Sequence, residues 1–168
     1  MAVLVTGGGG YIGSVVAEEL LARGREVIIL DSLKKGYREA VPPGAKLLEA
    51  DIQDTVALTE IFGGHSIEAV MHLAAESIVE ASMADPAMTF QANVCGGLNL
   101  LAAMRQSGVS KLIFSSTAAV YGEPKAVPIR EEHPLAPVNP YGESKLMFEK
   151  VLGWYGRAYG LRHISLRY

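Results

Sequence analysis

Short, uninterrupted apolar runs alternate along the chain with segments in which apolar residues recur at helical spacing. The runs predict strands at residues 2–6, 26–30, 45–50, 68–73, 111–115 and 163–167, and the spaced segments predict helices over 11–23, 55–62, 85–107 and 140–159. Strands without polar alternation are buried on both faces, and strands that alternate with helices form parallel sheets. The pattern therefore predicts an α/β, doubly wound Rossmann fold: one domain over residues 1–168, with a parallel sheet of about six strands and helices on both faces.

The composition is that of a folded domain. Hydrophobic residues make up 49% and charged residues 20% of the 168 positions, which excludes an intrinsically disordered chain. The net charge of −3 gives no reason to expect nucleic acid or a membrane surface as partner. Cys95 is the only cysteine, and the histidines have no ligand spacing, so neither a disulfide nor a metal site is predicted. With no signal peptide and no apolar run of ~18 residues, we expect a cytoplasmic protein.

A glycine-rich turn follows the first predicted strand. Residues 6–13 read Thr-Gly-Gly-Gly-Gly-Tyr-Ile-Gly, which places Gly7, Gly10 and Gly13 at regular spacing. A dinucleotide site needs a tight turn without Cβ atoms, so that the backbone can approach the pyrophosphate. The following helix offers unpaired N–H groups and the positive end of its dipole to the phosphates. Because a strand precedes the turn and a helix follows it, the sequence predicts a dinucleotide-binding site.

Acidic residues end the second and third predicted strands. Asp31, about 20 residues beyond the glycine turn, can accept hydrogen bonds from the adenosine ribose and would repel a 2′-phosphate, which favours NAD. Lys34 and Lys35 could favour NADP, although two lysines in a loop are usually only solvated. Asp51 could reach the adenine amino group or lie in a solvated turn, and the sequence favours neither.

Tyr141 and Lys145 share one face of the last predicted helix. A tyrosine pKa of about 10 is too high for a base at neutral pH, and a neighbouring ammonium, like an oxidised nicotinamide ring, would lower it. The same spacing arises by chance when a half-buried tyrosine lies beside a surface lysine. However, Ser115 to Thr117 leave the fifth strand where open α/β sheets bind ligands, and hydroxyls there can hydrogen-bond a reacting oxygen. Together these residues predict a proton-transfer site.

These motifs resemble the extended short-chain dehydrogenase/reductase family, and within it the nucleotide-sugar 4-epimerases. The resemblance rests on residues 6–13, 72–75, 115–122 and 141–145 and on Asn93, and it extends over the whole chain. It implies a cofactor site in which Gly7, Gly10, Tyr11, Ile12 and Gly13 line the pyrophosphate, Asp31 holds the ribose, Asp51 and Ile52 lie by the adenine, and Ala74, Ala75 and Ser115 flank the cofactor. Asn93 falls where relatives have a buried helix asparagine that is structural or orders water near the lysine.

The same resemblance implies the catalytic roles. Thr117 is placed as the catalytic Ser or Thr, Tyr141 as the base, and Lys145 as the residue that holds the nicotinamide ribose and tunes Tyr141. The implied reaction interconverts UDP-glucose and UDP-galactose: Tyr141 takes the proton of the sugar 4-hydroxyl, and NAD removes and returns the hydride at C4. Another nucleotide sugar, N-acetylated or uronic, is an alternative. A dTDP-glucose 4,6-dehydratase is less favoured, because Ala118-Ala119 stand where such enzymes carry an Asp-Glu pair.

Members of this family are longer than 168 residues. Their smaller domain, which binds the nucleotide sugar, is built mainly from segments after the sixth strand, so we expect this C-terminal substrate domain to be largely absent. An autonomous NAD-binding module without catalysis is therefore a second hypothesis. The resemblance also implies a homodimer through the helices at 85–107 and 140–159. The apolar residues expected in this dimer interface are Leu98, Leu101, Met104, Phe148, Val151 and Trp154.

Overall fold

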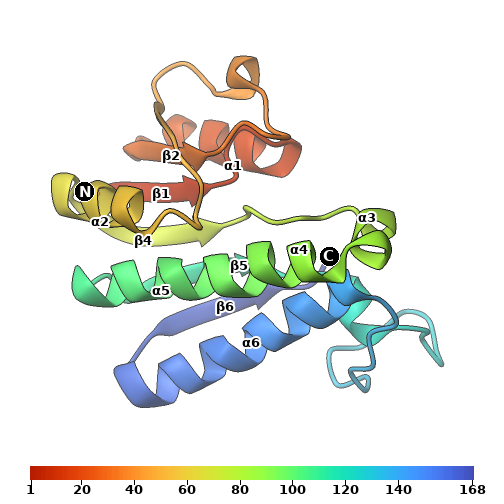
Figure 1. The fold of residues 1–168 in the computed structure, drawn as a ribbon. Coiled ribbons are helices and arrows are strands. Elements are labelled where there is room, and N and C mark those ends of the chain that lie inside the picture. Colours follow the sequence, from red (N-terminus) through yellow and green to blue (C-terminus); the bar gives the residue numbers. More distant parts are fainter.

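Six strands form one parallel sheet in the computed structural model, which describes residues 1–168 (Figure 1). They are β1 (Ala2–Thr6), β2 (Val27–Asp31), β3 (Lys46–Glu49), β4 (Ile67–His72), β5 (Lys111–Ser115) and β6 (Arg162–Leu166). The strand order is β3-β2-β1-β4-β5-β6, and every neighbouring pair is parallel. This is the order of a doubly wound dinucleotide-binding sheet, which confirms the predicted fold. Each strand lies within one residue of its prediction, but Asp31 belongs to β2 instead of following it.

The helices connect the strands, and three of the six begin at a side-chain N-cap. They are α1 (Tyr11–Ala22), α2 (Thr55–Gly64), α3 (Val79–Ala84), α4 (Pro86–Phe90), α5 (Gly96–Gln106) and α6 (Pro140–Tyr159), with short 3₁₀ turns at Arg38–Ala40 and Ala118–Tyr121. The Asn139 side chain accepts a hydrogen bond from the Gly142 N–H, and Pro140 occupies the first turn, so α6 starts where the sequence predicts. None of the helices combines the length and apolar character that crossing a bilayer requires.

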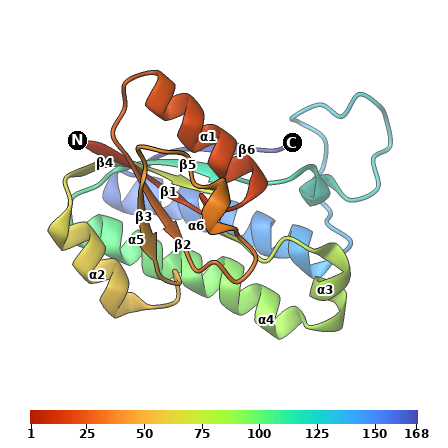
Figure 2. The ribbon, with the colours of Figure 1, turned by 90° about the horizontal axis from the view of Figure 1, so that it is seen from above.

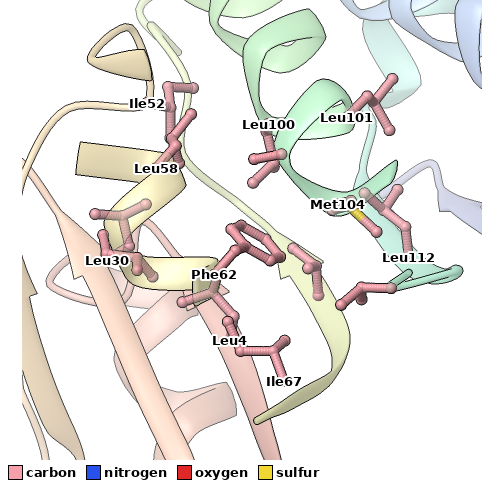
Figure 3. Packing of buried hydrophobic residues seen from close by; sticks show 14 of the residues in the cluster. Leu4, Leu30, Ile52, Leu58, Phe62, Ile67, Leu100, Leu101, Met104 and Leu112 are labelled. Carbon is pink, nitrogen blue, oxygen red and sulfur yellow. The ribbon is translucent and has the colours of Figure 1, made fainter. Parts of the chain in front are cut away.

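The two faces of the sheet are covered unequally (Figure 2). Helices α2, α5 and α6 pack on one face and enclose the larger core, in which Leu4, Phe62, Leu100 and Met104 are buried (Figure 3). On the other face α1 packs over β1 and β2, around a smaller cluster that includes Ala17. The part of that face formed by β6 stays open, and Ile164 is 57% exposed there.

The helix predicted over residues 85–107 is not regular. Between α4 and α5 the chain makes a π-helical stretch, Gln91–Cys95, whose flanking residues keep right-handed helical dihedrals, so the rod continues through it. A π turn accommodates an extra residue and often marks a functional site. The short α3 was not predicted, because Ser82 is its only buried residue and its apolar side chains Val79 and Met83 are exposed.

Three residues that the sequence assigned to a dimer surface lie in the core. Leu101, Met104 and Phe148 are at most 1% exposed, since they face the sheet. Helical spacing identifies an apolar face but not what covers it, which is why the assignment was wrong for these residues. Leu98 and Trp154 are exposed on α5 and α6.

Candidate active site

A cavity of about 630 Å³ opens at the carboxyl edge of the sheet, where strand order reverses between β1 and β4. Open α/β sheets bind ligands at this position. Most of the predicted site residues lie on its wall, namely Gly7, Gly10, Tyr11, Ile12, Gly13, Asp31, Asp51, Ile52, Ala74, Ala75, Ser115, Tyr141 and Lys145. Asn93 and Thr117 do not line it. The fold therefore brings segments that are distant in sequence to one cavity.

The glycine turn leaves no room for a side chain where the backbone itself is in the way, at Gly7 and Gly13. Gly7 has a φ of +75°, and a Cβ there would lie 2.6 Å from the Ala74 nitrogen. A Cβ on Gly13 would lie 2.1 Å from the Gly7 carbonyl oxygen, so glycine is required where α1 meets the turn. Gly10 is the N-cap of α1, and no side chain caps the helix. The first N–H groups of α1 are thus left for an anion.

The Asp31 carboxylate is fixed at the cavity wall. Its Oδ2 accepts a hydrogen bond from the Gly9 N–H and its Oδ1 accepts one from the Leu33 N–H, each at 2.8 Å. Gly36 lies against the same carboxylate, because a Cβ on it would be 2.9 Å from Oδ1. Each carboxylate oxygen can accept further hydrogen bonds, so Asp31 can still bind ribose hydroxyls.

The two lysines after β2 are paired with acids on neighbouring loops. Lys34 Nζ lies 2.9 Å from Asp51 Oδ2, and Lys35 pairs with Glu76. Burial acts to raise the pKa of Asp51, but the Gln53 N–H and the Lys34 ammonium outweigh it and hold that pKa below its ordinary value. Because both ammonium groups already have acidic partners, neither is a free cation for an additional phosphate.

Lys145 is buried beneath the cavity. Its Nζ donates a hydrogen bond to the Ser115 carbonyl oxygen at 2.9 Å and lies 5.9 Å from the centre of the Tyr141 ring. The side chain is 2% exposed, and burial lowers its pKa to about 7. Lys145 is therefore partly deprotonated near neutral pH, unlike an ordinary lysine.

The pKa of the Tyr141 hydroxyl is shifted in the direction opposite to the prediction. Burial raises its pKa and the nearby Tyr168 hydroxyl adds to the effect, whereas a hydrogen bond with Thr117 acts in the opposite direction without outweighing them. The sequence led us to expect a pKa lowered by Lys145. The ammonium is directed to the Ser115 carbonyl instead, and burial removes part of its charge. In this arrangement Tyr141 is protonated at neutral pH.

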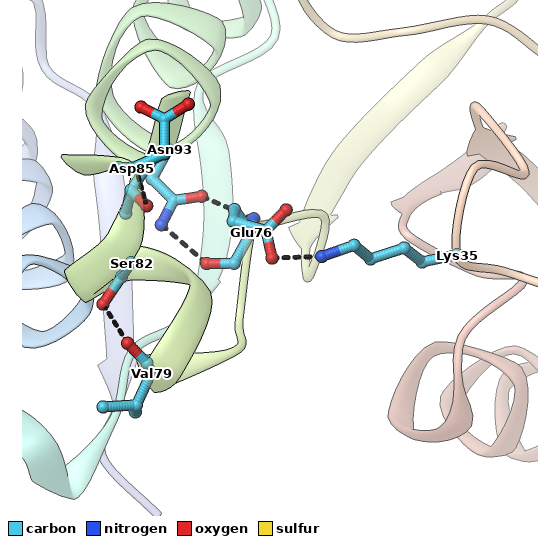
Figure 4. Close-up of polar contacts among 7 residues, drawn as sticks. Lys35, Glu76, Val79, Ser82, Asp85 and Asn93 are labelled. Carbon is cyan, nitrogen blue, oxygen red and sulfur yellow. Dashed lines mark hydrogen bonds and ion pairs between the residues drawn. The ribbon is translucent and has the colours of Figure 1, made fainter. Parts of the chain in front are cut away.

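Asn93 supports the wall of the cavity from behind (Figure 4). Its Oδ1 accepts a hydrogen bond from the Glu76 N–H at 2.7 Å, and its Nδ2 donates to the Glu76 carbonyl oxygen at 3.0 Å and to Ser144 Oγ at 2.9 Å. Ser144 Oγ in turn donates to the Tyr141 carbonyl oxygen at 2.7 Å. The amide is thus used within the protein, and Asn93 ties the segment after β4 to the helix that carries Tyr141.

Among the wall residues that the sequence reasoning missed are Glu76 and Tyr168. Glu76 is 8% exposed, and the Tyr168 hydroxyl lies 2.5 Å from Ser115 Oγ. Both follow the carboxyl end of a strand, β4 or β6, which is the signal that could have identified them. The structure gathers no group of three or more His, Cys, Asp or Glu side chains that could hold a metal ion.

The chain is similar to proteins of known activity. It is 50% identical over 168 residues to the UDP-glucose 4-epimerase of Lacticaseibacillus casei, covering 100% of this chain and 51% of that protein. The crystal structure of the Thermus thermophilus UDP-glucose 4-epimerase complex with NAD superimposes with a TM-score of 0.96 at 48% identity, covering 100% of this chain and 55% of that one. The UDP-glucose 4-epimerase of Thermotoga maritima with UDP-glucose gives a TM-score of 0.97 at 40% identity, with the same coverage of 100% and 55%.

The chain spans about half the length of the curated relatives that it matches. The shared half contains the glycine turn, Asp31 and the Tyr141-Lys145 pair described above. Residues 3–168 match the NAD dependent epimerase/dehydratase family, and the chain belongs to that family.

Proposed function

We propose that this chain is the NAD-binding and proton-transfer half of a UDP-sugar 4-epimerase. One observation carries the proposal: Tyr141, Lys145 and Ser115 line the same cavity as the glycine turn and Asp31. A dinucleotide with its pyrophosphate at the turn and its adenosine ribose at Asp31 would direct its nicotinamide end toward Tyr141. The names of the relatives, UDP-glucose 4-epimerase in each case, support the same reaction.

The residues present fit NAD. The uncapped N-terminus of α1 suits the pyrophosphate, and the Asp31 carboxylate suits ribose hydroxyls while it disfavours a 2′-phosphate. Ala74 and Ala75 leave room beside the turn, and Ile52 offers an apolar surface for the adenine. When bound, NAD supplies the acceptor and then the donor of hydride at the sugar carbon.

The proton is handled by the protein. In the proposed reaction the Tyr141 phenolate takes the proton of the sugar 4-hydroxyl and later returns it, while Thr117, which does not line the cavity, hydrogen-bonds the Tyr141 oxygen. Since burial raises the Tyr141 pKa, this role requires positive charge to come closer to the ring than in the structure of the chain alone. Lys145 is the protein group that can supply it, by turning its ammonium from the Ser115 carbonyl toward the phenol and the nicotinamide ribose.

A UDP-sugar is the proposed substrate, and UDP-glucose and UDP-galactose are the pair that we favour. Ala118 and Ala119 follow Thr117, so the chain offers no acid and base there for a 4,6-elimination. We also propose a homodimer through α5 and α6, with Leu98 and Trp154 as exposed apolar contacts. A monomer in sedimentation experiments at micromolar concentration would contradict the dimer.

A second candidate, an NAD-binding module without catalysis, is favoured by the raised pKa of Tyr141, which keeps this tyrosine protonated at neutral pH. Calorimetric titration with NAD, followed by an assay of UDP-galactose conversion, separates the two. We expect NAD binding and poor turnover by the chain alone, and turnover that rises when the second half of a relative is added as a separate polypeptide. Tyr141→Phe should abolish that turnover without weakening NAD binding. Absence of NAD binding would refute both candidates.

A further inference from the structure

The ion pair between Lys35 and Glu76 connects two loops that are not neighbours at the edge of the sheet. Lys35 belongs to the segment after β2, and Glu76 belongs to the segment after β4. Strand β1 lies between β2 and β4, so the pair passes over the end of β1, where the glycine turn begins. Both side chains line the cavity, and Figure 4 shows Lys35 reaching across to Glu76.

Hydrogen bonds fix the main chain of both segments that carry this ion pair. On one side, Asn93 hydrogen-bonds the N–H and the carbonyl oxygen of Glu76. On the other side, the segment of Lys35 is tied to the turn, because the Tyr37 N–H donates to the Gly9 carbonyl oxygen at 2.8 Å and the Leu33 N–H donates to Asp31. The pair therefore joins two anchored loops, and its geometry does not depend on a long flexible segment.

The two partners differ in exposure. The Glu76 side chain is 9% exposed and the Lys35 side chain is 51% exposed. A nearly buried carboxylate that loses its cation is left without compensation, which makes the separated state unfavourable. The closed arrangement is thus favoured, while the exposed lysine can still swing outward.

We propose that Lys35 and Glu76 form a clasp across the mouth of the cavity that slows the release of a bound dinucleotide. The inference rests on the proposed NAD site. A ligand seated between the glycine turn and the loops after β2 and β4 lies beneath this pair, and the pair must open before the ligand leaves. The clasp slows dissociation, because the pair must open before the ligand can leave and this opening adds to the barrier for release.

The test measures release of NADH from the loaded chain by its fluorescence after mixing with excess NAD. We expect Lys35→Met and Glu76→Gln each to speed release about tenfold, which corresponds to about 1.4 kcal/mol. The double variant should be no faster than the single variants, because the two residues form one interaction. Lys35→Arg, which keeps the charge and the reach, should release slowly like the wild type.

The matched control is Arg38→Met, on the same segment as Lys35. It removes an ion pair between Arg38 and Glu49 of β3, and neither of these residues lines the cavity. It should leave release unchanged. Normal NADH binding with unchanged release in Lys35→Met and Glu76→Gln, or rates that multiply in the double variant, would overturn the clasp alone. A wild-type chain that binds no NADH would overturn the clasp together with the proposed function.

Discussion

The Lys145 ammonium donates to the Ser115 carbonyl oxygen at 2.9 Å, and the same nitrogen lies 4.8 Å from the centre of the Phe114 ring. A lysine between a strand carbonyl and an aromatic ring is removed from water, and its pKa falls from its ordinary 10.5 to about 7. The arrangement has a cost in stability, because the unfolded chain keeps this proton where the folded chain releases it. It also makes the free energy of unfolding depend on pH, which can be measured.

The first prediction concerns stability against pH. Between about pH 7 and pH 10 the unfolded state binds the Lys145 proton more strongly than the folded state, so this group makes the free energy of unfolding rise with pH. The free energy of unfolding of Lys145→Met and of the wild type should be measured with urea at pH 6 to 9. Above pH 7, the value for the variant minus that for the wild type should fall by about 1 kcal/mol or more per pH unit. A difference that does not change with pH would contradict the lowered pKa.

A second prediction concerns acid stability. His72 is 1% exposed between Phe114 and Phe148, its Nδ1 lies 2.7 Å from Thr6 Oγ1, and burial followed by the Lys145 ammonium lowers its pKa to about 3. Between pH 6.5 and about 3 the unfolded chain binds this proton and the folded chain does not, so His72 makes the fold less stable as pH falls.

His72→Phe should remove this dependence. From pH 6.5 to 4.5 the wild type should lose about 2 kcal/mol relative to this variant, measured from urea midpoints. Parallel curves for wild type and His72→Phe would show that the imidazole is not held neutral.

A third prediction concerns the Tyr141 phenol. Absorbance titration of the chain, with Tyr141→Phe subtracted, should give a pKa above 10 without ligand, because burial disfavours the phenolate. Thr117→Val should raise this pKa further, since the Thr117 hydrogen bond is the contribution that lowers it. A pKa below 9 in the free chain would mean that Lys145 already tunes the tyrosine, as the sequence had suggested.

A fourth prediction uses two helical glycines in different surroundings. A Cβ on Gly97, in α5, would lie 2.4 Å from the Phe148 ring, whereas a Cβ on Gly153, in α6, meets nothing within 4 Å. Gly153→Ala should stabilise the chain by about 1 kcal/mol, and Gly97→Ala should destabilise it by about 1–3 kcal/mol. Thermal unfolding of the two variants measures both effects. Equal effects would show that the α5–α6 contact is looser than described.

Two of the strands, β1 and β2, could be predicted because their residues are buried on both faces. β1 and β2 are buried at every position, so apolar runs marked them without help from other parts of the chain. The glycine turn was predictable for a similar reason, since Gly7 and Gly13 meet local backbone constraints that only glycine satisfies. Features that depend only on neighbouring residues can be predicted from a short segment of the sequence.

What depended on distant contacts could not be predicted. The raised pKa of Tyr141 and the lowered pKa of Lys145 come from burial under other elements, which spacing on one helix does not reveal. Glu76 looked like an ordinary acid in a loop until the fold placed it opposite Lys35. Phe148 looked like a surface residue of α6, yet it packs against Gly97 and His72 in the core.

The π-helical stretch Gln91–Cys95 sets the rotational phase between the two parts of the long helix. Met88 before the stretch and Ala92 within it face the cavity, and Leu100 and Met104 after it face the core. Each residue of an α-helix advances the direction of the side chains by about 100°. Deleting one residue within the stretch would restore a regular α-helix but turn Met88 away from the cavity or Leu100 away from the core. At this point of the chain, insertions and deletions are therefore restricted more severely than substitutions.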